Sequence, residues 1–290
     1  MDAINAVTWK DKLRGYVKNP FSGFLFVIVV LAALITFAVL LFLISYILVR
    51  GIPHLNLRLF EWEYNTANVS MMPAIINTVI MVVLALILAG PLGIFSAIYL
   101  VEYAGSGNKL IKAVRVTTET LSGIPSIVFG LFGMLFFVMA LGWGFSMLAG
   151  AFTLSIMILP LIMRTTEEAL MSVPDSYREG SFALGAGKLR TIFRIVLPSA
   201  VPGILAGVIL SIGRVVGETA ALMFTAGTIA QIPHSVMDSG RTLAVHMYAL
   251  ANEGLHVNQA SATGVVLLVI VITINWLSGF AAKRLVKGEN

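Results

Sequence analysis

Two ionisable residues stand four positions apart in an otherwise apolar stretch of this 290-residue sequence. Arg214 and Glu218 are the only charged residues between Ala200 and Ala226. An ionised side chain near the middle of a bilayer costs at least about 2.5–3.5 kcal/mol, so such residues face the protein interior or a water-filled cavity. A helix through this stretch would place both side chains on one face. We expect either an ion pair that fixes helix packing or a site on a path through the membrane.

Arginine in such a place suits an oxyanion, because its planar guanidinium donates two parallel hydrogen bonds to phosphate-like oxygens. Glu218 would keep the empty cavity near neutrality. It could also accept a hydrogen bond from the protonated oxygen of hydrogen phosphate, an oxygen that sulfate lacks. Small residues, which let membrane helices approach closely, recur at every fourth position: Gly203, Gly207 and Ser211, then Gly213, Gly217 and Ala221. We therefore expect this segment at a helix–helix interface.

The composition places these residues in a membrane protein. The chain is 58% hydrophobic and 11% charged, with a mean hydropathy of +0.95, whereas soluble domains carry about 25% charged residues. The predicted fold is an all-α membrane protein with six transmembrane helices. The first is too long for a signal-peptide core, so we expect it to be retained. The runs that approach the roughly 20 apolar residues of a spanning helix are Phe24–Val49, Ala74–Leu100, Leu121–Leu141, Phe145–Met163, Ala200–Ala226 and Ala262–Ala282.

The distribution of lysine and arginine predicts the orientation. Fifteen of these residues fall in the N-terminal segment, the stretches 101–120 and 164–199, and the C-terminus. Three, Arg50, Arg58 and Arg241, fall in or directly beside the two loops on the other side. Basic loops stay in the cytoplasm, so both termini are expected there. The expected organisation is a cytoplasmic N-terminal segment, 1–23, a six-span transmembrane domain, 24–282, and a cytoplasmic tail, 283–290.

The outer loops, 51–73 and 227–261, hold all four histidines: His54, His234, His246 and His256. No pair has the spacing of metal ligands, so we interpret them as scattered solvated side chains and predict no metal site. Within the second loop, Ser239–Glu253 is expected to form a short amphipathic helix with Leu243, Met247 and Leu250 on one face. That helix would either cap the path or dock a partner.

The cytoplasmic stretch 164–199 is too polar to enter the membrane. Ser172 followed by Val-Pro-Asp175 is typical of a helix start, with Ser as the N-cap and Pro in the first turn. A short helix should follow through Ala183. Three later features are expected in the same stretch: a break at Gly185–Gly187, a second helix at Lys188–Val196 that Pro198 ends, and the next span, which Pro202 begins.

This stretch resembles the signature of the membrane subunits of bacterial ABC importers: Glu-Ala-Ala, three residues, Gly, nine residues, Ile-x-Leu-Pro. Here Glu179-Gly180-Ser181 precedes Gly185, and Ile195-Val-Leu197-Pro198 follows nine residues later, so the spacing is intact. Gly180 and Ser181 replace the two alanines with other small residues. The resemblance implies a type I ABC importer fold, in which this coupling-helix loop seats in a groove of the ATP-hydrolysing subunit. The residues that it assigns to coupling are Asp175, Glu179, Gly180, Ser181, Gly185, Ile195, Leu197 and Pro198.

Three further strings resemble the permeases of phosphate importers, and the Ala-Ala-Leu in the first is more similar to the second permease chain of that system than to the first. The resemblance implies a subunit that forms the translocation path for inorganic phosphate, with Arg214 and Glu218 on it. Arg164 would either guide the anion out at the cytoplasmic mouth or act only as a basic anchor. The strings are Gly213-Arg214-Val-Val-Gly217-Glu218-Thr-Ala-Ala-Leu222, Gly123-Ile-Pro-Ser-Ile-Val-Phe-Gly130 and Arg164-Thr-Thr-Glu-Glu168.

No nucleotide site is expected in this chain. Gly185-Ala-Gly-Lys188 is superficially similar to a phosphate-binding loop, but Phe182 stands in place of its first glycine and Leu189 in place of its Ser/Thr. The chain is then not an enzyme and binds no cofactor, and ATP and Mg²⁺ belong to a partner ATPase. The resemblance implies a second permease subunit in a heterodimer, an ATP-binding cassette ATPase dimer, a periplasmic or extracellular phosphate-binding protein, surrounding lipid and no nucleic acid, in the bacterial cytoplasmic (inner) membrane.

Three alternatives remain open from the sequence. The nearest is a sulfate or molybdate permease of the same superfamily. An ion-coupled secondary transporter is disfavoured by the coupling-loop signature and by the single acidic residue in the spans. An intramembrane enzyme is disfavoured because no Ser/His or His/carboxylate set lies within the spans.

Overall fold

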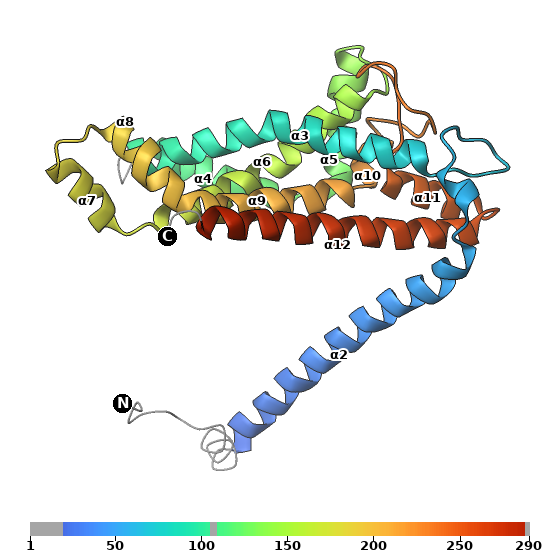
Figure 1. Cartoon of the computed structure of the whole chain (residues 1–290), viewed down its shortest axis with the longest axis horizontal. Coiled ribbons are helices and arrows are strands. Elements are labelled where there is room, and N and C mark those ends of the chain that lie inside the picture. Colours follow the sequence, from blue (N-terminus) through green and yellow to red (C-terminus); the bar gives the residue numbers. More distant parts are fainter. Residues whose placement is uncertain (1–19, 105–108, 288–290) are drawn as a thin grey trace. The chain divides into compact units, whose positions relative to one another are not determined.

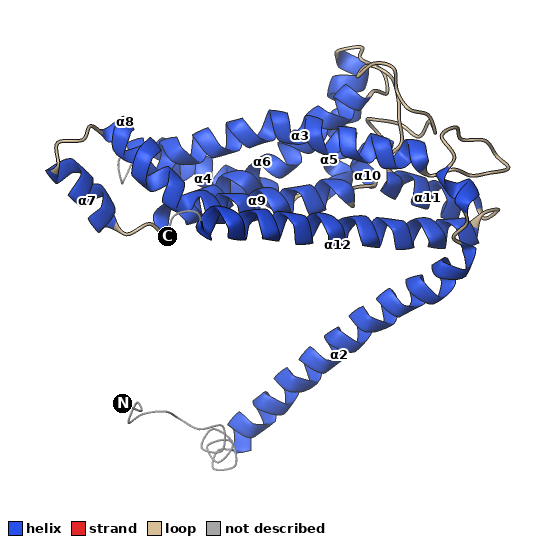
Figure 2. Cartoon of the chain, viewed as in Figure 1, coloured by secondary structure: helices blue, strands red, loops and turns tan. Residues whose placement is uncertain are grey.

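The computed structural model describes residues 20–104 and 109–287. Within these ranges every regular element is a helix and no strand occurs (Figure 2), which confirms the predicted all-α class. The predicted terminal segments, 1–23 and 283–290, lie partly outside the described residues. The first described helix begins at Pro20 and the last ends at Lys287.

The first span, α2 (Pro20–Gly51), belongs to a compact unit of its own that ends at Arg50. Its most apolar 18-residue window has a mean hydropathy of 3.3, and none of that window is buried within the chain. A helix that is apolar on every side is suited to lipid or to contact with another membrane helix. The remaining residues, from Gly51 onward, form the second unit, which carries every candidate functional residue.

The second unit is a helical bundle in which α6 lies between α3 and α9, and α12 lies along α9 (Figure 1). The coupling-loop elements α7 and α8 lie at one end of this bundle, and α10 and α11 lie towards the other. The elements in chain order are η1 (Ile52–His54), η2 (Leu57–Phe60), α3 (Met72–Ile98), η3 (Tyr99–Tyr103), α4 (Lys109–Ser122), α5 (Ser126–Gly133), η4 (Met134–Ala140), α6 (Met147–Met171), α7 (Asp175–Ala183), α8 (Lys188–Thr191), η5 (Ile192–Val196), α9 (Leu197–Val216), α10 (Ala220–Met223), α11 (Leu243–Glu253) and α12 (Val257–Lys287).

Five described helices are long and apolar enough to cross a membrane, and a bent pair makes six if it counts as one span. The second helix of the pair corresponds to the predicted third span, Leu121–Leu141, whereas the first lies mostly in the stretch 101–120 that was expected to be cytoplasmic. Ile111–Ser122 and Ser126–Ala140 meet at 102°. The bend falls at Pro125, which caps α5 in an extended conformation. Proline lacks an N–H and disfavours a helical conformation in the residue before it, so the helix breaks there.

The fifth span differs most from the prediction of Ala200–Ala226. The helical stretch runs from Lys188 to Val216, so the predicted separate helix and the predicted stop at Pro198 are both wrong. Pro198 lies in the first turn of α9 and Pro202 inside it. The π-helical segment η5 comes directly before them. Such local π adjustments re-satisfy backbone groups that proline would leave unpaired, so the helix continues through both prolines.

Small residues bring α9 against α6, as the sequence predicted. A Cβ on Gly203 would stand 2.6 Å from the Cβ of Ala169, and one on Gly207 would overlap Thr165. These close approaches hold α9 beside the most buried helix of the unit. Gly213, one turn before the end of α9, has open space where its Cβ would be. The packing interface therefore covers the first part of the predicted row of small residues and leaves Gly213 uncovered.

The outer loop 227–261 folds back onto the start of α3. Asn77 donates from Nδ2 to the carbonyl oxygens of Gln231 (2.9 Å) and Arg241 (3.1 Å), and Thr78 Oγ1 accepts from the Leu243 amide (2.9 Å). The predicted amphipathic helix exists as α11, four residues shorter at its start than expected. Its predicted apolar residues Leu243 and Leu250 are fully buried within this chain. The helix therefore docks on its own subunit.

His246 corrects the expectation that all four histidines are solvated. Its side chain is completely buried in α11, and its ring meets the Tyr64 ring edge to face at 6.1 Å between centroids. The sequence pattern did not predict the burial of His246, because the buried face of α11 is wider than the predicted apolar stripe. Burial, and secondarily the charge of Arg241, lower the pKa of His246 from 6.5 to about 3. Helix α11 is not among the candidate spans.

We expect this histidine to make the protein acid-sensitive. The folded chain holds His246 neutral, whereas the unfolded chain protonates it near pH 6.5, so its stabilisation is complete above pH 6.5 and is lost as the pH falls towards 3. At pH 5 the free energy of unfolding is lower than at neutral pH by on the order of 2 kcal/mol. Thermal unfolding of the purified protein at pH 7.5 and pH 5.0 measures it.

In that comparison His246→Gln should flatten the drop in unfolding temperature between the two pH values. His234→Gln, at an exposed position, should keep the wild-type drop. An equal drop in the wild type and in His246→Gln would contradict the assignment.

Candidate functional site

The coupling-loop stretch forms the first of the two predicted short helices, α7, and a sharp turn then leads into the long helical stretch that begins at Lys188. Helix α7 ends at Ala183, and Gly185 follows with a φ of +81°, a conformation that side-chain-bearing residues adopt only under strain. Its start differs from the prediction, because Ser172 is not the N-cap of α7. Ser172 is the C-cap of α6, and its hydroxyl donates back to the Ala169 carbonyl oxygen at 2.7 Å. Pro174 takes the N-cap position instead.

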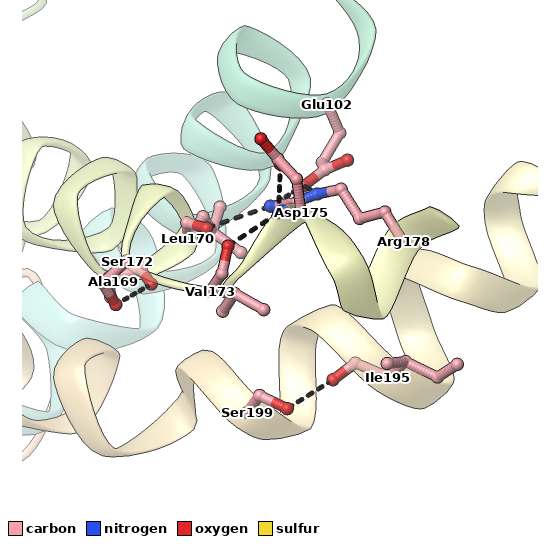
Figure 3. Close-up of polar contacts among 9 residues, drawn as sticks. All are labelled: Glu102, Ala169, Leu170, Ser172, Val173, Asp175, Arg178, Ile195 and Ser199. Atoms are coloured by element: carbon pink, nitrogen blue, oxygen red, sulfur yellow. Dashed lines mark hydrogen bonds and ion pairs between the residues drawn. The ribbon is translucent and has the colours of Figure 1, made fainter. Parts of the chain in front are cut away.

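Arg178 holds α7 to the rest of the bundle (Figure 3). Its Nη2 and Nε donate to Glu102 Oε1 at 2.8 and 3.1 Å. The same guanidinium donates to the carbonyl oxygens of Leu170 (3.0 Å) and Val173 (2.9 Å), and to Asp175 Oδ1 at 3.1 Å. The side chains of Arg178 and Glu102 are 15% and 8% exposed. An arginine with this many partners in a shielded place fixes the orientation of its helix.

Sequence reasoning missed Glu102, which lies 76 positions from Arg178. Glu102 lies in η3, the π-helical end of the second span. In the sequence it looks like an ordinary acidic residue that follows a membrane helix. Tyr103 from the same turn stacks under Lys188, with 4.8 Å from Nζ to the ring centroid. Glu102 and Tyr103 therefore hold α7 and α8, respectively, from one element.

The small pair that follows Glu179 divides between two environments. Ser181 is buried, and its hydroxyl lies 2.8 Å from that of Thr191, so it joins α7 to α8 within the chain. Gly180 has open space where a Cβ would be. Only Gly180 is therefore available for close contact with another protein, and the expectation that both small residues pack against a partner holds at most for one of them. The Glu179 side chain is exposed.

The end of the motif lies in the continuous helix. Ile195 lies within the π segment, and Ser199 Oγ donates to its carbonyl oxygen at 2.8 Å (Figure 3). Leu197 and Pro198 open α9, and Leu197 packs against the buried cluster at the ends of α3 and α6. A pocket of about 300 Å³ opens beside this turn, lined by Ser181, Leu184, Gly185, Ala186, Arg190, Arg194 and Ile195.

The loop presents an apolar surface outward. Five large side chains on it are between 46% and 90% exposed: Tyr177, Phe182, Leu184, Leu189 and Phe193. Exposed apolar patches of this kind, rimmed here by Arg190 and Arg194, mark sites of contact with another protein or a membrane surface. We call these five residues the coupling surface.

The predicted pairing of Arg214 with Glu218 on one helical face is not what the structure shows. Helix α9 ends at Val216, so Glu218 lies beyond it. Glu218 is 8% exposed, and its Oε1 accepts from the Ala221 amide at 3.0 Å, which caps the short helix α10. The glycine at 217 ends α9 and separates the two residues.

Arg214 lies in the last turn of α9, where a cation is favoured by the helix dipole. Its side chain is half-buried, and no hydrogen bond or ion pair to it is found within the described part of the chain. Because the helix starts at Lys188, Arg214 lies about 39 Å along it at 1.5 Å per residue. That places Arg214 at the end of the bundle far from the coupling loop, rather than halfway along the span.

Arg164 lies near the other end, two turns before α6 reaches the loop. It pairs with Glu168 at 3.0 Å, and the neighbouring Arg115 pairs with Glu167 at 2.5 Å. These four residues line a pocket of about 270 Å³ together with Thr118, Glu119, Ser122, Met163 and Met171. The pocket thus carries two arginines and three glutamates, and Arg214 is not part of it. Sequence reasoning found Arg164 and missed its four charged neighbours as a group.

Comparison with known proteins gives the chain a family. Residues 89–288 match the family described as binding-protein-dependent transport system inner membrane component. A probable ABC transporter permease protein, YqgI of Bacillus subtilis, is 34% identical over 277 residues, which cover 88% of this chain and 94% of the relative. The phosphate transport system permease protein PstA of Mycobacterium leprae is 38% identical, over 78% of this chain and 75% of the relative.

Solved structures show the same fold. A chain of a bacterial alginate ABC transporter, in complex with an alginate-bound periplasmic protein, aligns with a TM-score of 0.69 at 18% identity over 96% of this chain and 98% of that chain. A chain of the MetNI methionine ABC transporter aligns with a TM-score of 0.57 at 19% identity over 74% of this chain and 94% of that chain. These relatives do not favour a sulfate, molybdate or ion-coupled transporter. From the match over residues 89–288 and the near full-length relatives, the chain belongs to the family of binding-protein-dependent transport system inner membrane components.

Proposed function

We propose that this chain is a permease subunit of an ATP-driven importer of inorganic phosphate and forms part of the translocation path. The observation that carries the proposal is Arg214, a half-buried cation at the end of α9 without an acceptor among the described residues. Guanidinium donors that leave water need oxygen acceptors. A tetrahedral oxyanion supplies them in the planar geometry that arginine prefers. The relatives named as phosphate transport permeases support phosphate as that anion.

Glu218 contributes in a different way from the predicted ion pair. Its Oε1 fixes α10 next to the end of α9, and its charge keeps this region from binding an anion too tightly. A transport site must hold its substrate firmly enough to receive it and weakly enough to release it. A carboxylate near Arg214 serves the second requirement.

Arg164 is proposed to act in release rather than in capture. Its pocket carries one more glutamate than arginine, and both arginines already have carboxylate partners. A phosphate that arrived there would meet net repulsion. The pocket lies at the loop end of the bundle, which we expect to face the cytoplasm because its loops are basic. An anion leaving the path would therefore pass into the cytoplasm.

The coupling surface is proposed to seat on a separate ATP-hydrolysing subunit. Support comes from the family's signature spacing, the exposed apolar side chains and the anchoring of α7 by Arg178. The further partners proposed are a second permease subunit, a second copy of the ATPase and an external phosphate-binding protein. Lipid would surround the spans, both termini would lie in the cytoplasm, and ATP and Mg²⁺ would bind the ATPase and not this chain.

Gly180 tests the contact with the ATPase. Gly180→Arg places a long side chain in open space, so the chain's own thermal stability should not change, while a partner that packs there is pushed away. Overpacking of about 1–3 kcal/mol would weaken association by about fivefold or more. Co-purification of the ATPase and phosphate uptake both measure the loss.

Gly180→Ala is the matched control and should behave as wild type, because the family signature itself has alanine there. Gly185 is a poorer test, because its φ of +81° makes any substitution strain the loop directly. Full ATPase recovery and normal uptake with Gly180→Arg would rule out this seating of the loop.

Arg214 tests the translocation path. Arg214→Gln removes the charge and the guanidinium fork but keeps a polar side chain, so phosphate uptake should fall by about tenfold or more, while the complex still assembles. Arg58→Gln makes the same change at an exposed position in the outer loop and should leave uptake unchanged. Near-normal phosphate accumulation by assembled Arg214→Gln complexes would refute the role.

A further inference from the structure

A second arginine at the outer end of the bundle is more deeply buried than Arg214. Arg241 precedes α11, and the residue is 5% exposed. Its backbone is fixed on both sides: its amide donates to the Ile229 carbonyl oxygen at 3.0 Å, and its own carbonyl oxygen accepts from Asn77 Nδ2 at 3.1 Å. Gly240 lies so close to Asn77 that a Cβ would stand 2.8 Å from Nδ2. The guanidinium is therefore held in place by its surroundings before any ligand arrives.

Two of the three nitrogens of this guanidinium lack acceptors in the part of the chain that the structure describes. Nε and Nη2 are buried and have no hydrogen-bond partner among the described residues. The guanidinium carbon lies 4.6 Å from the centroid of the Tyr64 ring, which attracts the cation through its face. That contact leaves the in-plane N–H groups unsatisfied, because a ring face replaces no carboxylate or carbonyl oxygen. His246 nearby is neutral at physiological pH and adds no second charge.

A small pocket of about 240 Å³ opens at Arg241, below the roughly 300–1,000 Å³ that drug-sized ligands occupy. Arg241 is its only cation and Glu253 its only carboxylate. Hydroxyl and amide groups on Thr228, Tyr248 and Asn252 can also donate into it. The remaining lining residues are Met223, Val245 and Ala249. The pocket has the size and donors for a small inorganic oxyanion.

The pocket also lies beside the segment that follows Glu218. Met223, one of its walls, is the last residue of α10, whose start Glu218 caps. Only five positions separate Glu218 from Met223 in the chain, and α10 fills four of them. An anion at Arg241 would therefore lie beside the segment that follows Arg214 in the chain, towards the end of the bundle away from the coupling loop.

We propose that the Arg241 pocket is a second oxyanion site, which receives inorganic phosphate at the outer end of the permease before the anion reaches Arg214. This rests on the proposed function for its choice of phosphate. Arg241 supplies the donors, Tyr64 and Asn77 hold it in position, and Glu253 keeps the affinity low enough for onward transfer. Arg214 and Arg241 would act in series.

The test measures equilibrium binding of radiolabelled phosphate to the assembled transporter in nanodiscs, without the external binding protein. The Arg214→Gln transporter should keep saturable phosphate binding, and Arg214→Gln with Arg241→Gln should lose it. Two variants of the pocket lining change the affinity for phosphate while Arg241 itself is kept. Glu253→Gln removes a repelling charge and should tighten binding about three- to tenfold, whereas Thr228→Glu adds one and should weaken it by a similar factor.

Thr66→Glu is the control for Thr228→Glu, because it adds the same charge at an exposed position of the outer loops that does not line the pocket. If Arg241→Gln does not fold, the Glu253 and Thr228 variants decide, since both side chains are exposed. Equal affinities for Glu253→Gln, Thr228→Glu and Thr66→Glu would overturn the proposal.

Two other results would separate the site from the proposed function. No phosphate binding by Arg214→Gln, with normal uptake by the wild type, overturns the second site and leaves phosphate import standing. No phosphate uptake by the wild type overturns phosphate import itself. Unchanged phosphate binding by Arg241→Gln with weaker docking of the external phosphate-binding protein would show that a partner's carboxylate, not free phosphate, fills the pocket.

Discussion

The buried ion pair between Arg178 and Glu102 is the contact on which the coupling loop depends. It joins α7 to the end of the second span, and the same guanidinium donates to carbonyl oxygens in the last turn of α6 and just after it. A buried pair adds little net stability over apolar packing, but losing one partner costs about 3–5 kcal/mol. The ion pair therefore fixes the position of α7 against the bundle more than it adds to the stability of the fold. With Ser181 against Thr191 and Lys188 over Tyr103, it lets α7, α8, α3 and α6 move as one body, which is what a transmitted rigid-body shift requires.

Four arginines along the bundle, two towards each end, differ in their acidic partners. Arg115 and Arg164, near the loop, are each paired with a glutamate. Arg214 and Arg241, towards the far end, have no acidic partner among the described residues. Open donors attract an anion, and neutralised ones let it go. This asymmetry fits transport towards the cytoplasm, and it follows from where the carboxylates fall rather than from the number of arginines.

The sequence predicted the helical class, the spans and the loop well, because each depends on local signals: apolar length, glycine breaks and motif spacing. It misplaced the fifth span, since Pro198 and Pro202 read as helix boundaries and the π turn that accommodates them leaves no mark in the sequence. The pairing of Arg214 with Glu218 failed for a related reason, because it assumed a helix through Gly217. The sequence could not predict the contacts of Glu102 or the burial of Arg241 and His246, because these depend on residues far away in the chain.

The loop is proposed to transmit motion through the Arg178–Glu102 ion pair. The ratio of phosphate transported to ATP hydrolysed in proteoliposomes tests this proposal most directly. Glu102→Gln keeps the shape and removes the charge, so assembled complexes should hydrolyse ATP while moving several-fold less phosphate per ATP. Glu63→Gln makes the same change at an exposed position of the outer loop and should leave the ratio near the wild-type value. An unchanged ratio in assembled Glu102→Gln complexes would contradict the account.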